Sequence, residues 1–498
     1  MQIARNRVYS TERERPALIF IVICASYFLL HLLLRLSLSD TLDLDEAEQA
    51  FEAQQLRMGY GTQPPLYNWL QWLVFQVFGF NLFSLSVLKN LLLFATYVGM
   101  FRLARPRLGV DGAMAVSASL LLIPQIAWES QRDLTHSVLL TSLACMTLAS
   151  YFALLRRPTA MRYALFGLLI GLGLQTKYNF IIFAAGLMAA NLLTVQHREI
   201  FWNRKVWIAA SLALLCFLPH GLWILGHVEL AVGGTVRKMS EGARPSYLGN
   251  VGSGLGSMFL AALAFLTPLW LIYAWVCRRS FAKAAVDWRN PEARFFLCLY
   301  GAFFACILIL VLSGELSKVK DRWMQPLLFS APLAFFVILP AFADRLAFNR
   351  ILRTAAVVAL VILAAFPLRV YLAPLTGKSA RAHHPYPELS EEIVRRFPRA
   401  GTVIASEKLI AGNLHFHQPR LRTLLSDDVL RERMPLSGEL VLLERAPADS
   451  DWLEQFRLRY PQAVLMQEAR IDLPYRYGVK QMMSFQAVHL AMPLAPSP

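Results

Sequence analysis

The chain has 498 residues, of which 56% are apolar and 16% are charged, whereas soluble domains are roughly 45–50% apolar and about 25% charged. This composition excludes disordered, fibrous and disulfide-framework proteins. The net charge of +16 would suggest nucleic-acid binding in a soluble protein, but in a membrane protein it must first be compared with the loop topology.

The first apolar run, 17–38, follows Arg5, Arg7, Arg13 and Arg15. It is too long for a signal peptide and lacks a small-x-small cleavage site, so we interpret it as a retained anchor with a cytoplasmic N-terminus. Further apolar segments are long enough to cross about 30 Å of hydrocarbon, which gives about eleven predicted spans. These segments are 82–101, 112–128, 136–154, 161–176, 178–195, 206–225, 253–276, 295–313, 324–343 and 352–373.

Basic loops alternate with less basic ones along the chain. By the positive-inside rule the basic loops are cytoplasmic. Five such loops carry the lysines and arginines in question: Arg102, Arg105 and Arg107; Arg156, Arg157 and Arg162; Arg198, Arg204 and Lys205; Arg278, Arg279, Lys283, Arg289 and Arg294; and Arg345, Arg350 and Arg353. The opposite side then holds 39–81, 129–135, 226–252, 314–323 and everything after about residue 374. Topology therefore accounts for most of the positive charge, and no nucleic-acid partner is needed.

The first external loop concentrates carboxylates beside a hydrophobic span: Asp40, Asp43, Asp45, Glu46, Glu48 and Glu52. Segment 45–55 has helical character and is followed by Pro64-Pro65 and by the apolar stretch 66–80. We expect this stretch to be an interfacial helix that places Tyr67, Trp69 and Trp72 at headgroup level. The alternative is a solvated acidic loop.

Two more polar residues stand at the outer ends of predicted spans. Asp133 precedes the apolar run 136–154, where a lone aspartate is often an N-cap. Lys177 separates two apolar runs, and its simplest interpretation is snorkelling to the interface. Both residues are also candidates for a site at the outer membrane face.

A cluster of cations follows in the loop 314–323, on the side where few cations are expected. Lys318, Lys320 and Arg322 could bind a lipid phosphate through charge-assisted hydrogen bonds; a solvated charged turn is the alternative. Carboxylates and cations at one membrane face suggest chemistry on a lipid-linked phosphate, because a base can activate an acceptor while positive charge stabilises the leaving group.

The last part of the chain, 377–498, loses the long apolar runs. Segments 402–406 and 439–444 are predicted strands, and 388–397 and 451–460 are predicted amphipathic helices. The predicted fold class is mainly α: a polytopic membrane domain, 1–376, with juxtamembrane helices in 39–81, followed by a small external α/β domain.

No metal or disulfide framework is predicted. The six cysteines lie in or beside apolar runs without a CxxC pair. The histidines form no convincing ligand motif, so solvated or core histidines are the preferred interpretation and dependence on a divalent metal stays open.

The ordered set of outer motifs resembles the C-type glycosyltransferase superfamily, and within it glycosyltransferase family 39 with the bacterial aminoarabinose transferases and protein mannosyltransferases. The resemblance covers most of the chain. It is carried by Asp45-Glu46, Gln63-Pro64-Pro65-Leu66, Asp133, Thr176-Lys177-Tyr178, Pro219-His220-Gly-Leu-Trp223, Lys320-Asp-Arg322-Trp-Met-Gln-Pro326 and a turn at Gly412-Asn-Leu.

The resemblance implies a membrane glycosyltransferase of the bacterial inner membrane that moves a sugar from a polyprenyl-phosphate carrier to an acceptor at the periplasmic face. It implies catalytic roles for Asp45, Glu46 and Asp133, and donor-phosphate binding by Lys177, Lys318, Lys320 and Arg322. The expected substrate groove contains Gln63, Pro64, Pro65, Tyr67, Trp69, Tyr178 and His220. Aminoarabinose transferases have lysine where this chain has Gln63, which puts that particular sugar in doubt.

The expected reaction is an inverting displacement in which Asp45 accepts the proton of the acceptor hydroxyl while the polyprenyl phosphate leaves. No cofactor is required. The expected partners are a lipid-linked sugar donor, an envelope glycolipid or glycan acceptor such as lipid A or lipopolysaccharide core, and membrane lipid. Alternatives are a protein O-mannosyltransferase-like enzyme, a transporter or flippase of lipid-linked sugars, and a non-catalytic envelope scaffold.

Overall fold

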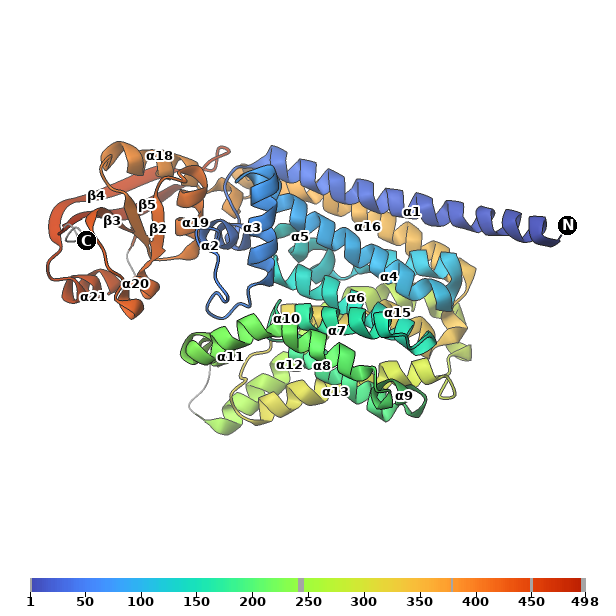
Figure 1. Ribbon diagram of the computed structural model, residues 1–498. Helices are drawn as coiled ribbons and strands as arrows, with labels where there is room; N and C mark the ends of the chain where they lie inside the picture. Colours follow the sequence, from blue (N-terminus) through green and yellow to red (C-terminus); the bar gives the residue numbers. More distant parts are fainter. Residues whose placement is uncertain (1, 241–245, 378, 448–450, 494–498) are drawn as a thin grey trace. The chain divides into compact units, whose positions relative to one another are not determined.

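The computed structural model describes residues 2–240, 246–377, 379–447 and 451–493, and they form a mainly helical protein with one mixed sheet (Figure 1). The chain divides into two compact units. The first unit comprises Met1–His31, Arg57–Tyr67 and Lys89–Ile362, and the second comprises Leu32–Leu56, Asn68–Leu88 and Leu363–Pro498. The first external loop therefore contributes segments to both units.

The long helices of the first unit are built from the apolar runs, and short helices lie in the loops between them. The helices of this unit are α1 (Gln2–Leu38), α4 (Leu82–Ala118), α5 (Ser130–Arg132), α6 (His136–Arg156), α7 (Ala160–Leu174), α8 (Phe180–Leu193), α9 (Glu199–Trp202), α10 (Val206–Gly226), α11 (Gly234–Met239), α12 (Tyr247–Cys277), α13 (Pro291–Leu312), α14 (Gln325–Leu328), α15 (Ala331–Ile338) and α16 (Arg345–Tyr371). Of these, α5, α9 and α11 are short helices in loops, and α1, α4 and α16 extend into the second unit.

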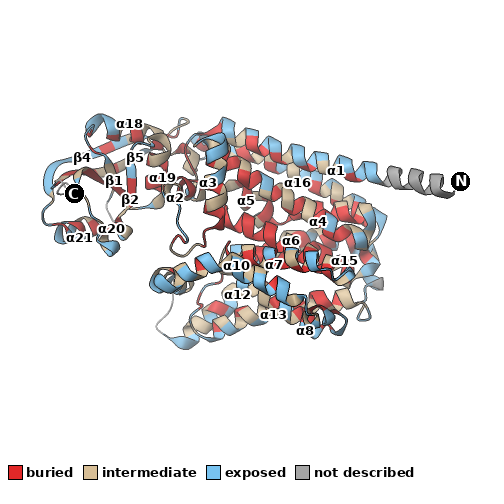
Figure 2. Cartoon of the chain, in the orientation of Figure 1, coloured by how far each residue is buried: buried red, intermediate tan, exposed pale blue. Residues whose placement is uncertain are grey.

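By length and composition, seven helices in the described part of the chain can cross a membrane, and the bent pair α8 and α9 raises this to eight. The predicted apolar segments all fall on helices or helical turns. Segments 82–101 and 112–128 share α4, which is interrupted at Gly109, where φ is 69°. Helix α6 is the most enclosed span, whereas α1 and α10 present mostly exposed apolar side chains (Figure 2), as expected where lipid replaces water.

The predicted span 112–128 does not continue as a regular helix. Helix α4 ends at Ala118, a 3₁₀ turn covers Ser119–Leu122, and a π turn covers Gln125–Glu129 after Pro124. Proline has no N–H to continue the helical hydrogen bonds, which explains the interruption. The consequence is an irregular outer segment that leads into Asp133.

The second unit contains the five-stranded sheet. Its strands are β1 (Thr402–Ala405), β2 (Arg422–Leu425), β3 (Gly438–Arg445), β4 (Val464–Pro474) and β5 (Met482–Met492), and its helices are α2 (Leu44–Glu52), α3 (Leu66–Phe78), α17 (Ala373–Thr376), α18 (Tyr386–Arg396), α19 (Lys408–His417), α20 (Ser426–Glu432) and α21 (Trp452–Arg459). Helix α3 begins in the first unit.

The sheet has the order β2-β1-β3-β5-β4, with β1 parallel to β2 and β3, and β5 antiparallel to β3 and β4. Alternate residues of β1 enter two cores. Val403 and Ala405 pack with apolar residues of α2, α18 and α19, whereas Ile404 packs with those of α20 and α21. Helices thus cover both faces of the sheet, which is usual for parallel strands.

The sequence predictions for this unit hold for the elements they named. The segments 402–406 and 439–444 are strands β1 and β3, and 388–397 and 451–460 are helices α18 and α21. The predicted turn at Gly412-Asn-Leu is wrong, because these residues lie inside α19.

The apolar stretch 66–80 also forms the expected helix, α3, which ends at Phe78 before Gly79 with φ of 83°. One detail was wrong. Tyr67 is completely buried within the first unit, with its ring 5.3 Å from that of His136, so it is not displayed at headgroup level. Leu73, Gln76, Val77 and Phe78 are the exposed residues of this helix.

Candidate active site

Asp45 lies in the first turn of α2, where a carboxylate interacts favourably with the positive end of the helix dipole. The helix packs tightly on α19. A Cβ at Gly412 would come within 1.9 Å of the carbonyl oxygen of Ala47, so only glycine permits this approach. Asn413 Oδ1 accepts a hydrogen bond of 2.8 Å from the N–H of Leu42, just before the helix. The helix that carries Asp45 is therefore fixed by α19 of the same unit.

Glu46 is almost fully buried, at 1% exposure, and is bound by Arg35 at the end of the α1 span. Arg35 Nη2 lies 2.6 Å from Glu46 Oε2, and its Nε lies 3.0 Å from Oε1. The same Oε2 accepts the N–H of Asp43 at 3.1 Å. This bidentate pair is charge-assisted and geometrically specific, so Glu46 connects the end of α1 to the start of α2, beside the half-buried Asp45.

The other acids of this loop have cationic partners from distant parts of the second unit. Asp43 lies 3.3 Å from Arg381 and 3.9 Å from Arg369, while Asp40 pairs with Arg476. The alternative of a solvated acidic loop is therefore wrong for Asp43, which is 13% exposed, whereas Asp40 stays 52% exposed beside its arginine.

Lys408 of α19 provides a further link to α2. Its Nζ lies 2.8 Å from Glu52 and also pairs with Glu48. Burial alone would lower the pKa of Lys408, but the carboxylates of Glu48 and Glu52 raise it above its usual range. The lysine thus stays charged and holds α2 against α19.

Asp133 and Lys177 both belong to the first unit and lie near the irregular segment before α6. Asp133 is 8% exposed. It is not the N-cap of α6, because Thr135 occupies that position. Lys177 Nζ donates to Ser137 Oγ at 3.1 Å, in the first turn of α6.

Lys89 is a buried lysine that the sequence analysis did not select. It lies in α4 at 2% exposure and donates to the carbonyl oxygen of Gln131 at 3.0 Å. The available signal was an ionisable residue inside an apolar run, which is costly in a membrane and usually functional. Two lysines, Lys89 and Lys177, therefore contact the segment 131–137 that includes Asp133.

The predicted groove residues of the first unit surround the turn between α7 and α8. The N–H of Leu66, which follows Pro64-Pro65, donates to the carbonyl oxygen of Gln175 at 3.1 Å. Both prolines are buried. This bond joins the Gln63-Pro64-Pro65 loop to the turn that carries Lys177 and Tyr178.

His220 of α10 is fully buried and holds the same region together. Its Nδ1 lies 2.8 Å from the carbonyl oxygen of Met58, and its Nε2 lies 3.3 Å from the hydroxyl of Tyr178. Since a carbonyl only accepts, Nδ1 carries the proton and Nε2 accepts from Tyr178. Trp69, the last predicted groove residue, lies in the second unit.

Three side chains at this turn and the loop joined to it have buried polar atoms without hydrogen-bond partners among the described residues: Gln63 Oε1, Gln175 Oε1 and both side-chain amide atoms of Asn179. Buried polar atoms are normally satisfied, and exceptions call for a functional explanation. A sugar hydroxyl is a suitable donor to the amide oxygens, and a hydroxyl or phosphate oxygen is a suitable acceptor for Asn179 Nδ2.

The basic loop 314–323 presents its cations outward. Lys318 and Arg322 are exposed and Lys320 is half-buried. Ser257 Oγ fixes the backbone by accepting the N–H of Val319 at 2.9 Å, and Asp321 accepts a hydrogen bond from Gln125 in the π turn. The loop is thereby attached to the segment that leads to Asp133.

No group of three or more histidine, cysteine, aspartate or glutamate side chains within the described ranges is arranged to hold a metal ion. The described cysteines are all unpaired thiols.

Comparison with known proteins gives consistent matches. The family model described as dolichyl-phosphate-mannose-protein mannosyltransferase matches residues 62–223. The lipopolysaccharide core galacturonosyltransferase RgtB of Rhizobium johnstonii is 36% identical and aligns over 94% of this chain and 96% of its own length. RgtA of the same organism, also a lipopolysaccharide core galacturonosyltransferase, is 34% identical over 92% and 94% of the two chains.

Solved structures show the same fold. ArnT from Cupriavidus metallidurans in its apo state matches with a TM-score of 0.59 and 12% identity, over 95% of this chain and 97% of the other. Its structure bound to undecaprenyl phosphate matches with a TM-score of 0.57 and 11% identity, over 94% and 97%. The chain is a multi-pass membrane glycosyltransferase, and it belongs to the C-type, aminoarabinose-transferase-like family that includes these lipopolysaccharide core galacturonosyltransferases.

Proposed function

We propose that this enzyme transfers galacturonic acid from a polyprenyl-phosphate carrier to a sugar of the lipopolysaccharide core. The observation that carries the proposal is the alignment with RgtB over almost the whole of both chains. Gln63 supports a sugar other than aminoarabinose, because it replaces the lysine that the resemblance to aminoarabinose transferases would place before Pro64-Pro65.

In the proposed reaction Asp45 is the general base. It accepts the proton of the acceptor hydroxyl as the hydroxyl oxygen attacks the anomeric carbon of the donor. The bond from that carbon to the phosphate oxygen breaks, the polyprenyl phosphate leaves with the electron pair, and the configuration inverts. A phosphate leaves without protonation, so a single base is sufficient, unlike the carboxylate pair of most glycosidases. Glu46, held by Arg35, acts as a positioning residue for Asp45.

The donor phosphate is assigned to Lys177, Lys318, Lys320 and Arg322. Charge-assisted hydrogen bonds from such cations stabilise the negative charge that develops on the leaving group. Lys89 and Lys177 both contact the segment that includes Asp133. The proposed role of Asp133 is to orient these two lysines or the donor sugar. The groove residues Gln63, Pro64, Pro65, Tyr67, Trp69, Tyr178 and His220 bind the sugar and the first isoprene units.

The proposed setting is the bacterial inner membrane. The N-terminus is cytoplasmic, residues 1–376 form the transmembrane catalytic domain with the juxtamembrane segment 39–81, and residues 377–498 form a periplasmic domain. The distribution of basic loops supports this orientation. No cofactor is proposed beyond the lipid-linked donor, because lysine and arginine side chains supply positive charge; transfer rates with and without excess EDTA test whether a divalent metal is also needed.

The substrate assignment can be tested with the purified full chain in detergent. Polyprenyl-phosphate galacturonate, the corresponding mannose donor and the aminoarabinose donor are each incubated with lipopolysaccharide core or with an unfolded secreted protein. We expect a mass increase only for core with the galacturonate donor. Transfer of mannose to protein would instead support the protein mannosyltransferase suggested by the match over residues 62–223.

A further inference from the structure

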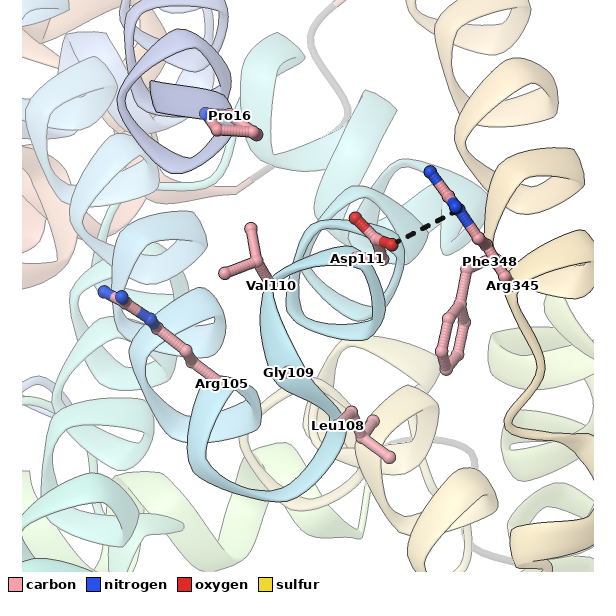
Figure 3. A pocket seen from close by; sticks show the side chains of 8 residues that line it. All are labelled: Pro16, Arg105, Leu108, Gly109, Val110, Asp111, Arg345 and Phe348. Carbon is pink, nitrogen blue, oxygen red and sulfur yellow. Dashed lines mark ion pairs between the residues drawn. The ribbon is translucent and has the colours of Figure 1, made fainter. Parts of the chain in front are cut away.

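The first unit contains a hollow whose lining includes none of the proposed catalytic residues. It has a volume of about 580 Å³ and is open to the surface (Figure 3). Three helices line it: α1 with Pro16, α4 with Arg105, Leu108, Gly109, Val110 and Asp111, and α16 with Arg345 and Phe348.

The break in α4 lies at this hollow. Gly109 has φ of 69°, a value that residues with a Cβ adopt at a cost, and a Cβ there would meet nothing within 4 Å. Glycine is therefore needed for the backbone conformation and not for close packing. The turn at Gly109 lies between Arg105 on one side and Asp111 with Arg345 on the other (Figure 3).

The two arginines of the hollow are weakly engaged. Arg345 is 85% exposed and lies 3.7 Å from Asp111, which is itself 48% exposed. Arg105 pairs with Glu14, and both side chains are exposed. Exposed pairs of this kind contribute little to stability, so an incoming anion can compete for the two cations.

Arg107, two residues after Arg105 in α4, is an arginine with a structural role. Its side chain is 7% exposed, pairs with Glu292 and stacks on the ring of Phe152 at 3.9 Å. The side chains of Arg105 and Arg345 are far more exposed than that of Arg107. Packing therefore does not explain the presence of these two arginines at the hollow.

The hollow lies where apolar spans begin. Pro16 immediately precedes the apolar run of α1, in which Leu18 and Ile19 are exposed, and Arg345 is followed in α16 by the exposed Leu346. Exposed apolar turns of this kind face acyl chains in a bilayer. The hollow therefore lies at the level of lipid headgroups, with cations at its mouth and apolar side chains of Leu108, Val110 and Phe348 in its wall.

We propose that this hollow binds the headgroup phosphate of an anionic glycerophospholipid in the cytoplasmic leaflet. The side of the membrane follows from the basic loops that contain Arg105 and Arg345. Basic pockets between transmembrane helices on this side suit anionic headgroups, and the apolar wall favours a lipid over a free anion. The bound lipid would connect α1, the break in α4 and the start of α16.

The test is native mass spectrometry of the purified full chain, titrated with phosphatidylglycerol or with phosphatidylcholine of the same acyl chains. Phosphatidylglycerol should bind about tenfold more tightly, and the double variant R105Q/R345Q should lose about that factor. Arg279→Gln, which removes an exposed arginine from another basic loop, is the matched control and should bind normally. Asp111→Asn should bind more tightly, because the competing carboxylate is gone.

Three results would overturn the proposal: equal binding of the two lipids, unchanged binding by the double variant, or displacement of phosphatidylglycerol by millimolar inorganic phosphate. The last result would indicate a site for free anions. Weaker lipid binding by R105Q/R345Q could come from the lost charges or from misfolding. The variant R105K/R345K retains both positive charges, so it should keep the preference for phosphatidylglycerol if charge is the cause.

Discussion

Arg35 at the end of α1 holds both carboxylate oxygens of Glu46, at 2.6 and 3.0 Å, one residue away from Asp45. An almost fully buried acid beside the proposed base is therefore neutralised by a fixed cation. This arrangement fixes the start of α2, where Asp45 lies.

Removing one partner of this pair should be costly. Arg35→Met leaves the carboxylate of Glu46 buried without its cation, and we expect a loss of about 3–5 kcal/mol in unfolding free energy, seen as a lower melting temperature of the purified protein. The double variant R35M/E46L should recover most of this loss, because both charges are gone. A double variant as unstable as the single one would contradict the ion-pair interpretation.

Gly412→Ala should separate α19 from α2, because the new Cβ would overlap the carbonyl of Ala47. We expect destabilisation of about 1–3 kcal/mol and reduced transferase activity, because α2 carries Asp45. Gly401→Ala is the matched control, since a Cβ there meets nothing within 4 Å, and it should melt like the wild type. Equal melting temperatures of the two variants would show that the close approach is not required.

Lys177→Met should reduce kcat/KM for the lipid-linked donor by roughly 100-fold, because one cation of the proposed phosphate site is lost. Lys177→Arg should retain much more activity. The control is Lys205→Met, whose ammonium donates only to the carbonyl of Pro158 among the described contacts. The measurement is initial rate against donor concentration, and a rate for Lys177→Met within twofold of the control would remove Lys177 from the phosphate site.

His384 should make the protein less stable in acid. Burial, together with Arg445 and Arg381, lowers the pKa of His384 from 6.5 to about 4. Between these values the unfolded chain binds a proton that the folded chain does not, so stability falls as the pH drops from about 6.5 to 4. The melting temperature should therefore decrease between pH 7 and pH 5, and less steeply in His384→Phe. An identical decrease in the variant would rule out this contribution.

The sequence was sufficient for the apolar helices, because hydropathy and basic loops report directly on membrane insertion. It also identified α2 and the strands β1 and β3. It could not supply the partners of the acidic loop, since Arg369, Lys408 and Arg476 follow it by more than 300 residues in the chain. The family resemblance implies a turn at Gly412-Asn-Leu, whereas here the glycine lies inside α19 and permits close helix packing.

The proposed phosphate-binding residues could be identified from the sequence, because they are cations at the outer ends of predicted spans. Lys89 had an equally strong signal, but it lies within a predicted span and was treated as part of it. Tyr67 was misplaced because an apolar helix does not reveal from its sequence which face is covered by protein and which by lipid.

The most direct test of the account compares Asp45→Asn with Asp40→Asn in the purified full chain. Both variants remove one carboxylate from the same loop, but Asp40 is committed to an ion pair with Arg476. With polyprenyl-phosphate galacturonate and lipopolysaccharide core as substrates, Asp45→Asn should show a transfer rate at least 1,000-fold below wild type, whereas Asp40→Asn should remain within a few fold. Near-normal galacturonate transfer by a correctly folded Asp45→Asn enzyme would contradict the account.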